Sequence, residues 1–419
     1  MSNNNDIKVR SADNKAKATL EQFFDNGVFT EVNSAFAEGN LAEAVCGYGY
    51  VDGMAVCAFC QDISESDGAM STAQAKKLTY IYELALKIGA PVVGFYNSKG
   101  ARISEGNVLL DALSKLLSLS SKLSGVVSQI SVVLGKCVGT TALLASNADF
   151  VIKSEDAVLA LDANAKSCNC AAINAKDEAE AIDAAKALIT YLPSNNLALS
   201  PAALDVEVNA ASDFMSAFDA NTTLELYKGS EASATYLARL EGNVVGVVNT
   251  TGKALEKDDI KKITKFVKFC DAFSIPVVTA VDCEGFKCLG GAKKVLSAYS
   301  EATTAKLSVI TGKAVGAVYL SVVGNSDFTV ALEGATVSPI KPEAAAYIML
   351  GDKLSIPVAE QDKLIAEFIA NDLSALNAAK SGYINDVVAV DDLRARMVSA
   401  LDILSSKREA AIPKKHTTV

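Results

Sequence analysis

The sequence is poor in histidine, and this restricts the chemistry that it can support. Its single histidine, His416, lies in a lysine-containing tail close to the C-terminus. A Ser-His-Asp or Cys-His arrangement would require this tail to fold back into a site. We therefore expect any catalysis to rely on carboxylates, lysines, hydroxyls or backbone dipoles.

The sequence also lacks long apolar runs and an excess of basic charge. Polar residues interrupt every apolar run before it reaches the ~18 residues that indicate a membrane-spanning helix, and residues 1–10 lack the apolar core of a signal peptide. The formal net charge is −10, so no basic stripe is available to displace counterions from nucleic acid phosphates. We expect a cytoplasmic protein that does not bind nucleic acid.

Cysteine is present in a number and spacing that predict neither a disulfide framework nor a metal centre. The nine cysteines are an odd number in a chain of 419 residues, unlike the frameworks of small secreted domains. Only Cys57-Ala-Phe-Cys60 has the spacing of a zinc ligand pair, and Met54–Cys60 is typical of a buried strand. We expect structural cysteines, no metal, and an apolar fraction of 50% that fills two or three domain cores.

The chain contains an internal repeat. Gly135-Lys-Cys-Val-Gly139 matches Gly312-Lys-Ala-Val-Gly316 at a constant offset of 177 residues (135 to 312 and 139 to 316). Asn147-Ala-Asp-Phe150 matches Asn325-Ser-Asp-Phe328 at an offset of 178, which implies one inserted residue. An apolar strand precedes each glycine motif, and a short helical stretch follows it.

The repeat extends upstream and predicts the fold class. Ile88–Phe95 matches Phe273–Ala280, and each follows an amphipathic helical pattern. Tyr50–Val56 matches Leu240–Gly246 as a strand pair with a glycine turn. Each half is therefore predicted to run strand-strand-helix-strand-helix-strand-helix, an α/β fold. The stretch from Ser167 to Ala232 shows no repeat partner, and we expect helical and linker structure there.

The repeated glycines allow two interpretations. Gly139 and Gly316 each stand where a strand ends and a short helix begins, so unpaired N–H groups there could bind an anion or form an oxyanion hole. Alternatively, the glycines only permit tight packing of strand and helix. Neither a GxGxxG nor a GxxxxGK[ST] motif is present, which excludes the standard dinucleotide and Walker-type phosphate sites.

Several motifs give the chain a family resemblance. It resembles the carboxyltransferase β subunits of biotin-dependent acyl-CoA carboxylases and the α subunits of biotin-dependent decarboxylases. The resemblance covers about residues 18–416. The motifs that carry it are Ala90-Pro-Val-Val-Gly94, Ser98–Gly106, Gly125–Cys137, Phe269–Thr279, Ala298–Thr304, Gly382–Val387, Ser406–Glu409 and Pro413–His416.

The resemblance implies a fold, a reaction and partners. It implies two tandem crotonase-like (ββα superhelix) domains: an acyl-CoA half at 18–165, a linker and helical segment at 166–231, a biotin half at 232–385, and a C-terminal helix with a basic tail at 386–419. It implies transfer of a carboxyl group between carrier-bound biotin and the α-carbon of a short acyl-CoA, without metal or NAD. The implied partners are a biotin carrier protein and biotin carboxylase or decarboxylase subunits. The implied assembly is a homodimer or hexamer in which the first half of one subunit faces the second half of another.

The resemblance also implies roles for particular residues. Two enolate oxygens must be held, so Gly139 and Thr140 are predicted to serve the acyl-CoA, and Gly316 and Ala317 to serve biotin. The motif that the family writes Ser-Gly-Gly-Ala-Arg appears as the run of predicted CoA-binding residues Ser98, Lys99, Gly100, Ala101 and Arg102. Lys136 and Lys313, which follow the first repeated glycine in each half, are secondary candidates for binding phosphate or carboxylate.

The chain departs from the family pattern in ways that leave alternatives open. Thr140 replaces a glycine, which keeps an N–H donor but narrows the site. The loop after Asp282–Phe286 and the middle segment are both shortened. A non-catalytic paralogue that acts as an assembly subunit is one alternative. Another crotonase-type acyl-CoA enzyme, such as a hydratase, is the second, and it would need an acid/base side chain for which Glu105 is the nearby candidate.

Overall fold

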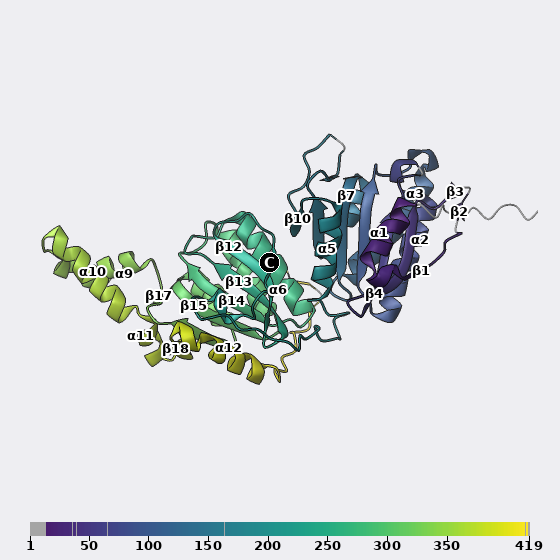
Figure 1. The fold of residues 1–419 in the computed structure, drawn as a ribbon. Coiled ribbons are helices and arrows are strands. Elements are labelled where there is room, and N and C mark those ends of the chain that lie inside the picture. The colour runs from purple at the N-terminus through teal and green to yellow at the C-terminus, as the bar shows by residue number, and fades with distance from the viewer. Residues whose placement is uncertain are drawn as a thin grey trace, which may run out of the picture. The chain divides into compact units, whose positions relative to one another are not determined.

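The computed structural model describes residues 14–35, 37–38, 40–64, 66–162, 164–414 and 416–417. The chain divides into two compact units, Met1–Pro201 (unit 1) and Ala202–Val419 (unit 2). Figure 1 colours unit 1 from purple to teal and unit 2 from green to yellow. The polar start at residues 1–10 and the last two residues of the predicted tail lie outside the described residues.

Unit 1 alternates strands and helices in the predicted order. Its elements are α1 (Lys15–Phe23), η1 (Asp25–Gly27), β1 (Phe29–Glu31), β2 (Ala37–Glu38), β3 (Asn40–Leu41), β4 (Ala44–Val51), β5 (Met54–Gln61), η2 (Ser66–Gly68), α2 (Thr72–Ile88), β6 (Val92–Ser98), η3 (Ile103–Glu105), α3 (Asn107–Leu123), β7 (Gln129–Val138), α4 (Thr140–Ser146), β8 (Phe150–Ser154), β9 (Val158–Ala160), β10 (Ile173–Ala175) and α5 (Glu178–Ile189).

Unit 2 repeats this order and adds helices near its end. Its elements are η4 (Met215–Ala217), β11 (Leu224–Leu226), β12 (Ser233–Leu240), β13 (Asn243–Thr250), α6 (Lys257–Ala272), β14 (Val277–Cys283), α7 (Leu289–Glu301), β15 (Lys306–Val315), α8 (Ala317–Ser321), η5 (Val323–Asn325), β16 (Phe328–Leu332), β17 (Thr336–Ser338), α9 (Pro342–Leu350), η6 (Gly351–Leu354), α10 (Val358–Asp372), α11 (Ala375–Lys380), β18 (Asp386–Val388) and α12 (Val390–Leu404).

The two sheets have the same topology, which confirms the duplication and the α/β class. Unit 1 has the strand order β1-β4-β5-β6-β7-β8-β10 with β9 beside β7, and unit 2 has β11-β12-β13-β14-β15-β16-β18 with β17 beside β15. The first three strands of each order are antiparallel, and the rest run parallel from the third strand onward. Parallel strands need crossover helices, and these cover the faces of each sheet.

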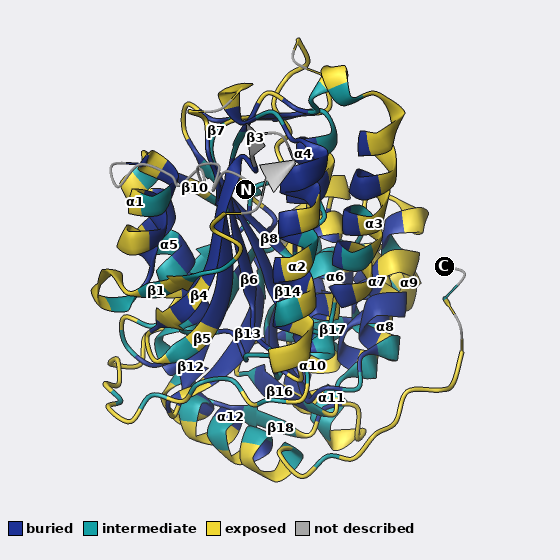
Figure 2. Cartoon of the chain, turned by 90° about the vertical axis from the view of Figure 1, so that its right-hand side faces the viewer, coloured by how far each residue is buried: buried dark blue, intermediate teal, exposed yellow. Residues whose placement is uncertain are grey.

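Apolar side chains on both faces of each sheet form the cores. In unit 1, helices α2 and α3 pack on the sheet through residues such as Leu78, Ile81 and Leu116. In unit 2, α12 brings Leu393 and Met397 against Val309. The central strands are almost wholly buried, whereas the helices keep exposed outer faces (Figure 2).

Local sequence signals explain where the main helices begin. Ser71 caps α2 by accepting the Gln74 N–H, and Gly89 ends this helix in a left-handed conformation. In unit 2, Glu256 and Asp259 form a capping box at the start of α6. These two equivalent helices therefore begin at strong capping signals, although the residues that provide the signals differ.

The segment predicted as linker, 166–231, contributes more structure than we expected. It adds β10 as a parallel edge strand on β8, the helix α5, and β11 as an antiparallel edge strand on β12. These elements have structural partners in the other half, since β10 and β18, and β1 and β11, occupy equivalent places in the two strand orders. The sequence comparison missed them because three-residue edge strands carry almost no pattern of their own.

The structure gives the repeated polar residues structural roles. Asp149 and Asp327 accept the first N–H of the neighbouring central strand, at Gln129 and Lys306, each at 2.8 Å. The buried Lys77 donates to the carbonyl of Ala44 at the start of β4. The equivalent Lys262 donates to the Ser233 carbonyl at the start of β12. Each strand is thus fixed at its start by a charged side chain, because a buried backbone group must find a partner.

The first glycine of each repeat makes room for a polar side chain of the adjacent strand. A Cβ on Gly135 would lie 2.6 Å from the Asn97 side chain, and a Cβ on Gly312 would lie 2.4 Å from the Asp282 carboxylate. Asp282 cannot easily move aside, because its Oδ1 accepts the Lys313 N–H at 2.9 Å. These glycines are therefore required for packing.

Gly312→Ala should lower the free energy of unfolding of the protein by about 1–3 kcal/mol, the cost typical of overpacking. Gly290→Ala is the matched control, because Gly290 lies in α7 and a Cβ added there would meet no atom within 4 Å; it should be neutral or stabilise by up to about 1 kcal/mol. Thermal unfolding of both variants measures the difference. Equal melting temperatures would contradict the packing argument.

Candidate functional site

The first candidate turn joins β7 to α4 through Gly139. Gly139 has φ 63° and ψ −133°, a conformation that favours glycine. Its N–H donates to the Ala160 carbonyl of β9 at 3.0 Å, and its carbonyl accepts the Leu143 N–H. The next N–H, that of Thr140 at the first position of α4, has no acceptor among the described residues.

The second candidate turn, between β15 and α8, has the same construction. Gly316 has φ 47°, and its N–H donates to the Ser338 carbonyl of β17 at 2.8 Å. The N–H of Ala317 finds no acceptor in the described part of the chain. In both turns the glycine N–H is thus already bonded within its own unit, and one free donor remains on the following residue.

This geometry narrows the interpretation of the four predicted catalytic residues. Gly139 and Gly316 cannot offer their own N–H groups to a ligand, because strands β9 and β17 hold them. Thr140 and Ala317 keep theirs, as expected for the first residue of a helix. The hydroxyl oxygen of Thr140 is buried without a partner among the described residues, so it does not cap the turn.

The predicted Ser98–Arg102 loop lies beside the first turn. Ser98 is fully buried at the end of β6, with its Oγ 3.3 Å from Thr141 Oγ1 and accepting the Gly100 N–H. A Cβ on Gly100 would lie 3.2 Å from the Val138 carbonyl oxygen. Ala101 pairs with Met70 in an isolated bridge. The loop and the turn are therefore in direct contact.

The charged residues of this loop are paired within unit 1. Lys99 Nζ lies 2.7 Å from an Asp67 carboxylate oxygen, and both side chains are largely exposed. Arg102 donates to the buried carboxylate of Glu43 and to Ser66 Oγ. Arg102 is thus a residue that holds the loop, whereas the exposed Lys99 can exchange Asp67 for another anion.

Glu105 has a structural position. Its Oε2 accepts the Thr72 N–H at 2.7 Å, at the start of α2, and its Oε1 lies 3.6 Å from the Arg102 guanidinium. A carboxylate occupied in this way caps a helix. The acid/base role that a hydratase would require of Glu105 therefore loses support.

The loop beside the second turn differs in the way its charges are paired. Glu284 lies within 3.7 Å of both Lys313 Nζ and Lys341 Nζ. Position 284 is the counterpart of Lys99, and Lys313 is the counterpart of Lys136. Each rim thus carries two lysines and one carboxylate: Lys99, Lys136 and Asp67 at the first turn, and Lys313, Lys341 and Glu284 at the second. The two rims differ in pairing, because Glu284 lies near both of its lysines, whereas the exposed Lys136 has no carboxylate partner in the described part of the chain.

Sequence reasoning missed several residues that shape these turns. Asn97 and Asp282 lie over the first glycines of the repeats, Ala160 and Ser338 accept the glycine N–H groups, and Glu43 holds Arg102. A polar residue at the same place in two otherwise apolar strands is a signal that would have found Asn97 and Asp282. No pattern marks Glu43, because the strand edge before β4 has no regular period.

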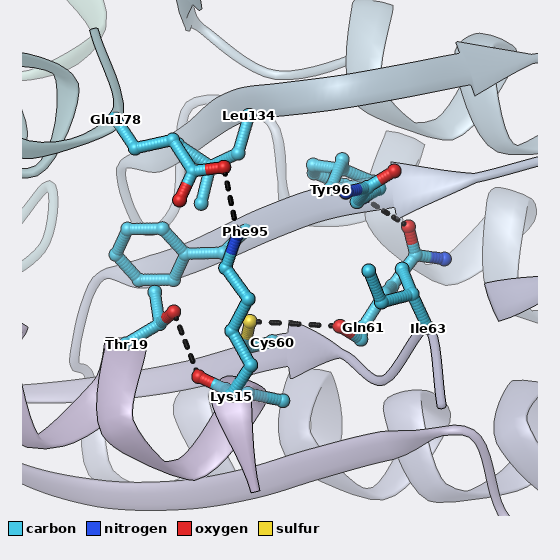
Figure 3. A pocket seen from close by; sticks show the side chains of 11 residues that line it. Lys15, Thr19, Cys60, Gln61, Ile63, Phe95, Tyr96, Leu134 and Glu178 are labelled. Atoms are coloured by element: carbon cyan, nitrogen blue, oxygen red, sulfur yellow. Dashed lines mark hydrogen bonds and ion pairs between the residues drawn. The ribbon is translucent and has the colours of Figure 1, made fainter. Parts of the chain in front are cut away.

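A small cavity in unit 1 lies apart from the candidate turns. About 20 Å³ of space is lined by residues of α1, β5, β6, β7 and α5, and Lys15 spans it to reach Glu178 at 2.9 Å (Figure 3). Burial raises the pKa of the lining thiol, Cys60, to about 12, so this thiol is protonated and a poor nucleophile at neutral pH. The cavity has room for a water molecule but not for a substrate.

The described residues contain no helix long and apolar enough to cross a membrane. Within the same residues, no group of three His, Cys, Asp or Glu side chains is placed to hold a metal ion. Cys57 and Cys60 lie in β5, the predicted buried strand.

Comparison with known proteins gives long matches. The family described as "Carboxyl transferase domain" matches residues 15–163 and 161–419. The methylmalonyl-CoA decarboxylase subunit alpha of Propionigenium modestum is 29% identical, over 96% of this chain and 92% of that protein. The propionyl-CoA carboxylase beta chain of Saccharopolyspora erythraea is 30% identical, over 96% and 90%. A crystal structure of transcarboxylase 12S, described as a hexamer with hydrolysed methylmalonyl-CoA bound, matches with a TM-score of 0.88 at 27% identity, over 96% and 92%.

Thiol labelling tests the interpretation of the cysteines. Iodoacetamide at pH 8 should modify Cys168 and Cys288, which are exposed, and leave Cys57 and Cys60 unmodified, because burial raises the pKa of both latter thiols to about 12. Peptide mass spectrometry of the native protein reads out each site. Labelling of Cys60 at the rate of Cys288 would show that the cavity is open to reagents.

Proposed function

Since the chain belongs to the carboxyl transferase domain family and is a biotin-dependent carboxyltransferase of acyl-CoA, we propose that its two glycine turns divide the reaction between them. The Thr140 N–H in unit 1 would hold the thioester oxygen of the acyl-CoA, and the Ala317 N–H in unit 2 would hold biotin. The observation that carries this proposal is the unpaired N–H at the same position of both turns.

The chemistry at the first turn follows from charge. Removing a carboxyl group or a proton from the α-carbon of an acyl-CoA places negative charge on the thioester oxygen. A fixed N–H donor in a site shielded from water stabilises this charge as it develops, and the donor need not reorient. The hydrogen bond of Gly139 to Ala160 fixes the direction of the Thr140 N–H, so the donor is in position before the substrate binds.

We assign the second turn to the ureido group of biotin. Ala317 offers one unpaired N–H. Its side chain is only a methyl group, which leaves more space than a threonine side chain, the one present at the equivalent position of the first turn, would leave. Biotin bound there, on a separate carrier protein, supplies the site that accepts or donates the carboxyl group. The Ala317 N–H would orient it, and the cluster of Glu284, Lys313 and Lys341 would supply the charged rim of its site.

Charge around the first turn supports binding of the CoA phosphates. Lys136 stands on its rim without a carboxylate partner in the described part of the chain, and the exposed Lys99 pairs with Asp67. Lys313, at the position equivalent to Lys136, pairs with Glu284. We assign phosphate binding to the lysines of unit 1. The backbone wall of the same site would be formed by Ser98, Gly100 and Ala101. Arg102 would hold this wall in place through its ion pair with Glu43.

The assembly and its location are part of the proposal. We propose a homodimer or hexamer in which unit 1 of one subunit meets unit 2 of another in the cytoplasm, with a biotin carrier protein and a biotin carboxylase or decarboxylase subunit as partners. The transcarboxylase 12S structure is described as a hexamer in a multienzyme core, which supports an oligomer. We keep the predicted domain functions: the acyl-CoA half at 18–165 and the biotin half at 232–385.

Removal of each free N–H tests the catalytic turns. Thr140→Pro should lower kcat for transfer from methylmalonyl-CoA to free biotin by about 10²–10³, the usual effect of one oxyanion donor. Proline is tolerated at the first position of a helix, and Gly139 before it has no Cβ to clash. Thr140→Ala keeps the N–H and is the control.

Ala317→Pro makes the same test at the second turn and should raise the KM for free biotin more than that for the acyl-CoA. Valine at Gly316 would be a poorer test, because a Cβ there would lie 2.7 Å from the Pro339 carbonyl oxygen and disturb the turn itself. Wild-type protein that is folded but inactive in this assay would instead support the non-catalytic paralogue.

Lys136→Ala should raise the KM for acyl-CoA by up to about fivefold, in line with the ~1 kcal/mol of an exposed ion pair. The effect should shrink in 0.5 M salt, because salt screens exposed charges. Lys313→Ala, at the equivalent position of unit 2, should leave this KM unchanged. Steady-state kinetics at two salt concentrations measures both, and equal effects of the two variants would remove Lys136 from the site.

A further inference from the structure

Glu43 is a fully buried carboxylate with two charged or polar partners. It lies immediately before β4 and is 0% exposed. One carboxylate oxygen receives the Arg102 guanidinium, and the other accepts the hydroxyl of Ser71. A buried charge must be paired and hydrogen-bonded, and breaking such a pair costs far more than an exposed ion pair contributes.

The partners of Glu43 belong to two segments that meet at the acyl-CoA turn. Ser71 is the N-cap of α2. Arg102 ends the loop that carries Lys99, Gly100 and Ala101. Glu43 thus ties this loop to the first turn of α2, and its backbone carbonyl accepts the Gln74 amide on the same helix.

The side of the Lys99–Ala101 loop that faces the Gly139 turn is tightly packed. Gly100 lies so close to the first turn that a Cβ would stand 3.2 Å from the Val138 carbonyl oxygen, and Ser98 Oγ lies 3.3 Å from Thr141 Oγ1. A shift of Arg102 must therefore be passed on to the wall beside the Thr140 N–H. The Glu43–Arg102 pair joins the start of α2 to this wall, together with the Met70–Ala101 bridge and the hydrogen bond from Thr72 to Glu105.

Unit 2 shows what the same connection looks like without a buried clamp. The bridge of Met70 with Ala101 recurs as a bridge of Leu255 with Phe286. At the position of Arg102, Lys287 pairs with Glu256 at 2.9 Å, and both side chains are more than 60% exposed. The backbone connection is thus duplicated, but only unit 1 reinforces it with a buried ion pair.

We propose that Glu43 is a positioning residue for the acyl-CoA site, which it shapes by fixing Arg102 and, through it, the Lys99–Ala101 loop. This inference rests on the proposed assignment of unit 1 to the acyl-CoA. Glu43 itself contacts no substrate. Its loss should displace the loop, and displacements of about 1 Å in a site reduce rates by up to about 10²-fold.

The test separates positioning from stability. Glu43→Gln removes the carboxylate that accepts from Arg102 most closely and leaves this partly buried guanidinium with Glu105 at 3.6 Å as its remaining carboxylate, so this variant should be destabilised. The double variant Glu43→Gln/Arg102→Met removes both charges and should recover much of the melting temperature. In the double variant, kcat/KM for methylmalonyl-CoA should fall by at least tenfold, while the KM for free biotin stays within twofold of wild type. Glu256→Gln, which weakens the exposed pair of unit 2, is the matched control and should leave the KM for methylmalonyl-CoA unchanged.

Each outcome bears on one proposal. A folded double variant with wild-type kinetics toward methylmalonyl-CoA would overturn the role of Glu43, as would an equal loss toward both substrates. A different result would show that the proposed function itself is wrong: Thr140→Pro would leave methylmalonyl-CoA turnover unchanged. If Thr140→Pro acts as expected and the double variant does not, only the positioning role fails.

Discussion

The structure depends on one backbone constraint that is met twice, at Gly139 and Gly316. A buried central strand has to turn directly into a helix, and it does so through a residue with positive φ whose N–H is bonded to a neighbouring short strand. The turn then leaves one N–H, on the next residue, pointing away from all partners within the described residues. The fold therefore produces a donor at the carboxyl end of each sheet as a by-product of its own hydrogen bonding.

The two units use this common backbone with different side chains. Lys99 in one unit corresponds to Glu284 in the other, Arg102 corresponds to Lys287, and Thr140 corresponds to Ala317. The first rim keeps Lys136 without a carboxylate partner among the described residues, and its loop is held by the Arg102–Glu43 pair. In the second rim both lysines lie near Glu284, and the loop is held by the exposed Lys287–Glu256 pair. In the proposed reaction, backbone geometry supplies the shared chemistry, and the different pairing of charges distinguishes the two ligands.

The sequence predicted the fold well because the duplication presents the strongest signals twice. The Gly-Lys-x-Val-Gly frame, the amphipathic helices and the glycine hairpins all lie where the structure has β7, β15, α2, α6 and the paired strands. The edge strands β10 and β11 were missed, since three residues at a sheet edge have neither length nor period. The acceptors of the Gly139 and Gly316 N–H groups could not be predicted either. Ala160 and Ser338 accept through their backbone carbonyls, and every residue type has such a carbonyl.

The sequence predicted the two turns of the candidate site but not the residues that hold the neighbouring loop in place. Motifs indicated Gly139, Gly316 and the Ser98–Arg102 loop, and the structure brings the first turn and the loop into contact. The role of Arg102 depends on Glu43, which lies 59 residues away in the sequence. Long-range pairs of this kind follow from tertiary packing, so a single sequence does not reveal them.

The separation of the chain at Pro201 and Ala202 has a consequence for its synthesis. The strands of the first sheet and its crossover helices are complete by Ile189, and the described core cluster around α2 and α3 contains residues of unit 1 alone. Domains fold as units while the ribosome is still adding residues. The first half can accordingly reach its native structure before the second half has been translated in full, once the chain up to Pro201 has left the ribosome.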